Sequence, residues 1–152
     1  MLHRVLSIFA ACFFAAVIAL AGDKNANDAN NLQGTWQAVD LEANGQKSPD
    51  DQVKELQIVI KGDEVLALKP DGEGRKCKFK FDSSKTPNTI DVSPIDGPDK
   101  GKMAAGIYSL QNGQLRLCVN IFGQDTALRP TEFKTQPGNG VIFVTLERAK
   151  RK

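Results

Sequence analysis

The stretch Leu32-Gln33-Gly34-Thr35-Trp36 opens a series of short segments in which apolar and polar residues alternate. Alternation with a period of two is the pattern of strands that bury one face. From this stretch to the last alternating segment, Val141 to Arg148, turn signals recur about every 8–12 residues, a spacing typical of an all-β sandwich or barrel. The sequence therefore predicts an all-β domain that begins at Leu32.

Turn, helix and strand signals along the chain predict the remaining elements. The first strand, Gly34 to Ala43, ends at Asn44-Gly45, a dipeptide suited to a turn with positive φ. Ser48 as a cap, a proline at the first helical position and two acids then predict one short helix through Glu55, closing one end of the fold. Further strands are expected at 56–61, 65–69, 76–81, 90–92, 106–110 and 114–121.

The N-terminus is expected to direct export. Val5 to Leu20 is apolar except for Ser7, follows Arg4 and ends at a small-x-small cleavage pattern. The stretch is shorter than the roughly 20 residues of a membrane-spanning helix, so we expect a cleaved signal peptide over 1–21 and no stable membrane insertion afterwards. Residues 22–31 are predicted to be a disordered spacer, 32–149 one domain, and 150–152 a basic frayed tail.

Composition limits the chemistry. The only histidine, His3, lies in the export signal, so the mature chain lacks the residue needed for histidine general-base catalysis, histidine-assisted nucleophiles and the usual zinc sites. We expect no enzyme, no metal and no cofactor. Twenty basic and 18 acidic residues give a formal net charge of only +2, which predicts no general affinity for nucleic acid.

Two cysteines remain after export, in a compartment that permits disulfides. Cys77 shares a strand face with Phe79 and Phe81, whereas Cys118 is out of phase with the apolar residues of its own strand. The favoured prediction is therefore one buried and one surface thiol. A disulfide remains the alternative, because a bulge would reverse the phase.

Two charged features are interpreted as structural. Lys76, Lys78 and Lys80 alternate with apolar residues and predict the solvated face of a strand, with an anionic partner as the alternative. The loop 94–102 is rich in Pro, Gly and Asp. It lacks the spacing and the bidentate terminal acid of a calcium loop, so a structured turn is predicted.

The Gly34-x-Trp36 motif on the first strand and Arg148 on the last resemble the lipocalin and calycin pattern. The resemblance implies a small lipocalin-like antiparallel barrel of about eight strands, in which Arg148 lies over the Trp36 ring in a structural cation–π contact. A longer series is similar to a lipocalin-like domain family abundant in planctomycete bacteria, and it implies bacterial export but no established activity. The series comprises 32–36, 90–91, 96–101, 106–108, 115–118, 129–133 and 137–138.

Two functions are weighed. The first is binding of a small apolar or amphipathic ligand inside the barrel. Its predicted lining residues are the apolar ones expected to face inward: Leu56, Ile58, Ile60, Phe79, Phe81, Tyr108, Leu115 and Leu117. The second is a protein-interaction or inhibitor-like module with a filled barrel, whose N-terminal arm contacts a protein partner.

Arg129 and Glu132 stand in the most distinctive segment and are predicted to fix the crossing into the last strand. We also expect the protein to be a monomer, located in the periplasm or outside the cell of a bacterium.

Overall fold

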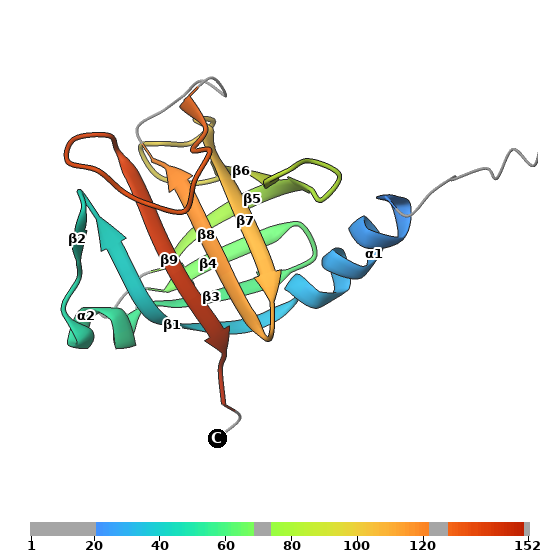
Figure 1. Ribbon diagram of the computed structural model, residues 1–152, viewed down its shortest axis with the longest axis horizontal. Coiled ribbons are helices and arrows are strands. Elements are labelled where there is room, and N and C mark those ends of the chain that lie inside the picture. Colours follow the sequence, from blue (N-terminus) through green and yellow to red (C-terminus); the bar gives the residue numbers. More distant parts are fainter. Residues whose placement is uncertain (1–20, 69–73, 122–127, 151–152) are drawn as a thin grey trace, which may run out of the picture.

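The computed structural model describes residues 21–68, 74–121 and 128–150, with side chains from residue 24 onward. Residues 1–20 of the predicted export signal at 1–21, Lys69 at the end of the predicted 65–69 strand and the last two residues of the basic tail lie outside these residues. The described chain has nine strands and two short helices (Figure 1). They are α1 (Ala21–Leu32), β1 (Gly34–Ala43), β2 (Gln46–Lys47), α2 (Asp50–Glu55), β3 (Gln57–Lys61), β4 (Glu64–Leu68), β5 (Gly74–Asp82), β6 (Asn88–Pro94), β7 (Ala104–Gln111), β8 (Gln114–Asn120) and β9 (Val141–Arg148).

Eight of the strands form a closed antiparallel barrel. From β3 to β9 each strand pairs with the next along the chain, and β1 pairs with both β3 and β9, which closes the sheet. The two-residue β2 pairs only with the end of β1. The predicted barrel of about eight strands is confirmed, with two short helices in place of one in the described part.

The antiparallel order gives the barrel two different ends. The β3–β4, β5–β6 and β7–β8 turns, the start of β1 and the end of β9 gather at one end, where α1 also lies; we name it the α1 rim. The end of β6, the start of β7, the end of β8, the start of β9 and the β1–β2 turn lie at the opposite end. An opening into the barrel would therefore lie at one of two ends, which are formed by different segments of the chain.

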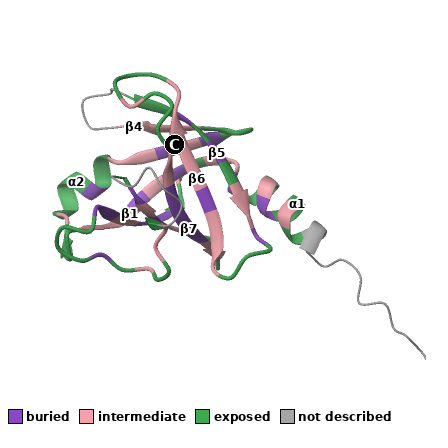
Figure 2. Cartoon of the chain, turned by 90° about the horizontal axis from the view of Figure 1, so that it is seen from above, coloured by how far each residue is buried: buried purple, intermediate pink, exposed green. Residues whose placement is uncertain are grey.

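Inward-facing side chains form one main apolar cluster. Figure 2 shows that buried residues lie on the strands of the barrel wall. On β5, for example, Cys77 and Phe79 are buried while Lys76, Lys78 and Lys80 are exposed, which is the predicted alternation. Trp36, Tyr108, Leu115 and Leu146 are each no more than 1% exposed. Burial of these large side chains is the main favourable term that holds the barrel together.

Two Asn-Gly turns have positive φ: the predicted one after the first strand and a second one between β7 and β8. Asn44 and Gly45 have φ of 53° and 73°, and Asn112 and Gly113 have φ of 52° and 77°. Positive φ at both central residues is the type I′ arrangement, whose twist matches that of the flanking strands. These two turns set the β1–β2 and β7–β8 registers.

The prediction of a disordered spacer at 22–31 was wrong, because α1 occupies it. Its composition is polar, yet Asn25, Asp28 and Leu32 recur at helical spacing and face the barrel. Asp28 and Leu32 are buried there, at 9% and 1% exposure. Contacts with the barrel stabilise a helix that its own sequence would not form, since tertiary packing supplies most helical stability.

Helix α2 has the predicted extent, but its cap differs. Pro49 is the N-cap residue, and no side chain caps the helix, so the predicted role of Ser48 was wrong. Val53 is buried in the main cluster. The Gln37 amide donates to the carbonyl oxygen of Lys54 at 2.8 Å, which ties α2 to β1.

Candidate functional site

All eight predicted ligand-lining residues lie in the main cluster. Ile58, Ile60, Phe79, Tyr108 and Leu115 are buried, and Leu56, Phe81 and Leu117 are partly buried against them. The rings of Phe79 and Phe81 stack at 5.9 Å between centroids, and Phe81 meets Tyr108 edge to face at 6.0 Å. The sequence thus identified the interior correctly, and the interior side chains pack on one another.

The Arg148 guanidinium lies 4.1 Å from the centroid of the Trp36 ring, which confirms the predicted cation–π contact. It also donates to the carbonyl oxygens of Gln33 and Asn31. A Cβ on Gly34 would lie 2.6 Å from Arg148 Nη1, and Gly34 has a φ of +113°. The glycine of the motif is therefore required both by the backbone conformation and by the approach of the arginine.

Helix α1 is fixed to its rim by polar contacts. The Tyr108 hydroxyl donates to Asp28 Oδ2 at 2.8 Å, and the Ser83 backbone N–H donates to Asn25 Oδ1 at 2.8 Å. Lys24 Nζ donates to Asn88 Oδ1 at 3.1 Å. Burial and, next, the bond to Asp28 raise the pKa of Tyr108 far above its ordinary value.

A pocket of about 290 Å³ opens at the α1 rim beside the end of the helix. Its lining is Asn31, Trp36, Leu110, Gln111, Asn112, Gly113 and Arg148. Trp36 and Leu110 also belong to the main cluster and its packed margin. The pocket thus connects solvent with the margin of the apolar core, next to a guanidinium and a polar turn.

Residues 128–136 cross the outer face of the barrel from β6 toward β1. Arg129 donates to the carbonyl oxygens of Ile90 and Gly106 at 3.0 and 2.8 Å and pairs with Asp91 Oδ1 at 2.7 Å. At the other end, the Thr135 hydroxyl donates to Glu42 Oε1 at 2.6 Å. Arg129 fixes the crossing as predicted.

Glu132 does not share the role predicted for it with Arg129. Its carboxylate forms an ion pair with Lys134, and both side chains are mostly exposed. This pair lies within the crossing segment and does not join it to a strand.

Both cysteines are buried and free, so the prediction of one surface thiol was wrong. Cys118 does face away from the barrel interior, as its phase predicted, but the crossing segment covers it. Its Sγ lies 3.4 Å from the carbonyl oxygen of Glu132, beside an outer cluster of Ile107, Val141, Phe133 and Phe143. Burial raises the pKa of both thiols.

The lysine face of β5 and the loop 94–102 both form ion pairs at the surface. Lys78 pairs with Asp63 at 3.1 Å. In the loop 94–102, Asp99 pairs with Arg75 at 3.2 Å and with Lys102 at 3.0 Å, while Gly97 and Gly101 have positive φ. The loop is a structured turn, as predicted, and its aspartate contacts cations of the chain itself.

Sequence reasoning missed the residues that α1 contributes to the rim. The signal that could have found them is the spacing of Asn25, Asp28 and Leu32, which places them on one face of a helix. This spacing was missed because the segment is polar, and a helix face with only one large apolar residue does not give an amphipathic pattern.

A scan against protein-family models found no match, and searches of curated proteins and of solved structures found none either. Among the helices that the structure describes, none is long and apolar enough to cross a membrane. The described residues also contain no group of three or more His, Cys, Asp or Glu side chains placed to hold a metal ion. The site is therefore defined by its geometry alone.

Proposed function

We propose that the protein is a binding module that takes a small apolar or amphipathic ligand at the α1 rim of the barrel. The observation that carries the proposal is the rim pocket of about 290 Å³, because it joins solvent to the margin of the apolar core. Its size is close to the lower end of the roughly 300–1,000 Å³ typical of small-molecule sites. Its lining combines a smaller apolar part, Trp36 and Leu110, with a larger polar part, which suits an amphipathic ligand.

An amphipathic ligand fits the two sides of this pocket. Its apolar part would lie against Trp36 and Leu110, and its polar end would face Asn112 and the backbone of the β7–β8 turn. Arg148 is already bonded to two carbonyl oxygens and the Trp36 ring, so it shapes the wall without requiring an anionic ligand. Deeper entry toward the eight interior residues would require α1 to shift and those side chains to repack.

A filled barrel that acts as a protein-interaction module is the second candidate. It is favoured by the packing of all eight interior residues into one cluster. In this case recognition takes place on the outer surface. The N-terminal segment would not act as a free arm, because α1 is bonded to the barrel.

Native mass spectrometry of the mature protein, purified gently from its own exported fraction, separates the two candidates. A reproducible extra mass that is lost on denaturation supports a ligand and identifies it. A bare monomer mass, unchanged after incubation with dodecanoate, dodecylamine and dodecyl maltoside, refutes the ligand proposal and favours a protein partner.

Fluorescence locates the ligand, because Trp36 is the only tryptophan. Binding at the α1 rim should shift Trp36 emission, and Leu110→Gln should weaken binding at least tenfold, about 1.4 kcal/mol. Val39→Gln is the matched control, since Val39 is an exposed apolar residue of β1. Equal affinities of the two variants would place the ligand elsewhere.

We also propose that the chain is an exported bacterial protein of the planctomycete lipocalin-like family, a periplasmic or extracellular monomer without enzymatic activity. The proposal is supported by the apolar N-terminal stretch, the ordered motif series and the absence of histidine beyond His3. N-terminal sequencing of the protein from cell fractions tests export. A chain that retains residues 1–21 in the cytoplasm would contradict it.

A further inference from the structure

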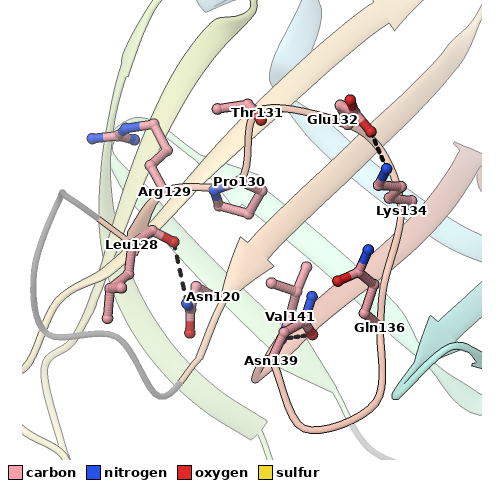
Figure 3. Close-up of a pocket in the computed structure, with 10 residues that line it drawn as sticks. All are labelled: Asn120, Leu128, Arg129, Pro130, Thr131, Glu132, Lys134, Gln136, Asn139 and Val141. Carbon is pink, nitrogen blue, oxygen red and sulfur yellow. Dashed lines mark hydrogen bonds and ion pairs between the residues drawn. The ribbon is translucent and has the colours of Figure 1, made fainter.

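A second pocket, of about 370 Å³, lies at the opposite end of the barrel, on its outer side (Figure 3). The crossing segment, the end of β8 and the start of β9 line it. Its residues are Asn120, Leu128, Arg129, Pro130, Thr131, Glu132, Lys134, Gln136, Asn139 and Val141. It shares none of its lining with the rim pocket, so it is a separate candidate site.

The charged side chains described in this pocket already have partners within the chain. Arg129 points away from the hollow in Figure 3, and its guanidinium contacts two carbonyl oxygens and Asp91. Glu132 and Lys134 neutralise each other by an ion pair at the edge. An ionic ligand would have to break one of these pairs, so the described lining residues offer no net charge to a phosphate, carboxylate or amine.

The neutral polar groups of the pocket come from several segments. Thr131 supplies an exposed hydroxyl and Gln136 an exposed amide, one on each side of the hollow. Asn139 Oδ1 accepts from the Val141 backbone N–H at 3.0 Å, which holds the amide in place. An amide both donates and accepts, and a hydroxyl does the same, so these groups match ligands rich in hydroxyl groups.

The remaining lining is apolar. Pro130 supplies ring carbons between the polar groups and Leu128 is 54% exposed beside them, whereas Val141 is only 7% exposed. A sugar ring presents hydroxyl groups at its edge and C–H groups on its faces. It would therefore lie on the apolar carbons while its hydroxyls meet Thr131 and Gln136.

We propose that this outer pocket binds a neutral sugar or a similar polyol. The three observations that lead to this class are the volume, the internally neutralised charges and the combination of amide and hydroxyl groups with apolar carbons. The proposal is independent of ligand binding at the α1 rim, since the two pockets lie at opposite ends of the barrel.

The test is an NMR titration of the mature protein with maltose and N-acetylglucosamine, each at tens of millimolar, with backbone amide shifts as the readout. The expected result is a saturable shift confined to 128–141 and the end of β8. Thr131→Ala and Gln136→Ala should each weaken binding at least threefold, whereas Gln46→Ala, an exposed amide on β2, should leave it unchanged. Both substituted residues are exposed, so the variants should fold, and the spectra themselves report this.

Two outcomes would overturn the proposal. One is the lack of a saturable shift with either sugar, or a shift that the two pocket variants leave intact. The other is tighter binding of glucuronate or glucosamine than of the neutral sugars at low salt, which would show that the pocket selects charge. Shifts confined to the α1 rim would support binding there and likewise overturn the outer site.

Discussion

Arg129 is expected to be the most costly polar side chain to remove from the outer face. Its guanidinium contacts the carbonyl oxygens of Ile90 and Gly106 and the carboxylate of Asp91. Asp91 Oδ1 is buried and has no hydrogen bond within the described residues beyond this ion pair. In Arg129→Met the carboxylate would therefore lose its cation without gaining a replacement.

The magnitude follows from the exposure of the pair. Removing one partner of a buried ion pair costs about 3–5 kcal/mol. The Arg129 and Asp91 side chains are 20% and 32% exposed, so solvent lowers this part to about 2 kcal/mol. Loss of the charge-assisted bonds to two carbonyl oxygens adds about 1 kcal/mol. We expect Arg129→Met to lower the free energy of unfolding by about 3 kcal/mol.

Urea denaturation followed by Trp36 fluorescence measures the change. With an m-value of about 1.5–2 kcal/mol/M, the midpoint should fall by about 1.5–2 M. Arg75→Met is the matched control, because the Arg75–Asp99 pair has side chains that are 48% and 38% exposed and should contribute little. Asp91→Asn combined with Arg129→Met should cost less than the sum of the single changes. A loss no larger than that of Arg75→Met would refute the reasoning.

Three further predictions concern other buried groups. Burial and Asp28 raise the pKa of Tyr108 in the folded protein, so Tyr108 of the unfolded chain ionises first as pH rises. The free energy of unfolding should therefore fall as pH rises above about 10. Absorbance at 295 nm follows the ionisation of this single tyrosine, and ionisation without unfolding would contradict the prediction. Gly106→Ala should cost about 1–3 kcal/mol in urea melts, because the added Cβ would lie 2.7 Å from the carbonyl oxygen of Cys118; an unchanged midpoint would contradict the packing. Cys77 and Cys118 should react with a thiol reagent only after unfolding, and rapid labelling of Cys118 in the native protein would contradict the cover that residues 132–134 give it.

Local signals in the sequence predicted the barrel well. The Asn-Gly turns, the alternation on β5 and the phase of Arg148 relative to β9 each depend on neighbours a few residues apart, so a single sequence carries them. Closure of β1 against β9 depends on contacts across the whole domain. It was predictable only through the resemblance that joins Trp36 to Arg148.

Two of the wrong predictions, the surface thiol at Cys118 and the disordered spacer at 22–31, have one physical cause. Alternation states which face of a strand a residue occupies, but not whether something covers that face. Cys118 faces outward as predicted and is nevertheless buried, because residues 132–134 cross over it. Helix α1 is the same case at the rim, since its order depends on Ser83 and Tyr108, which lie far away in the sequence.

The two segments that cover the barrel, α1 and the crossing segment, also limit where a ligand can bind. A barrel of eight strands has an interior just wide enough for its own side chains, and Trp36, Tyr108, Leu115 and Leu146 occupy it here. The two segments outside the barrel wall, α1 and the crossing segment, each leave a pocket at their margin, of about 290 and 370 Å³. Each segment is held by polar contacts and by one apolar side chain packed on the barrel, Leu32 of α1 and Phe133 of the crossing segment. Under both binding proposals, ligand specificity depends on residues at the margins of these two segments, and substitutions of the exposed ones, such as Gln111 and Gln136, should change binding without loss of the fold.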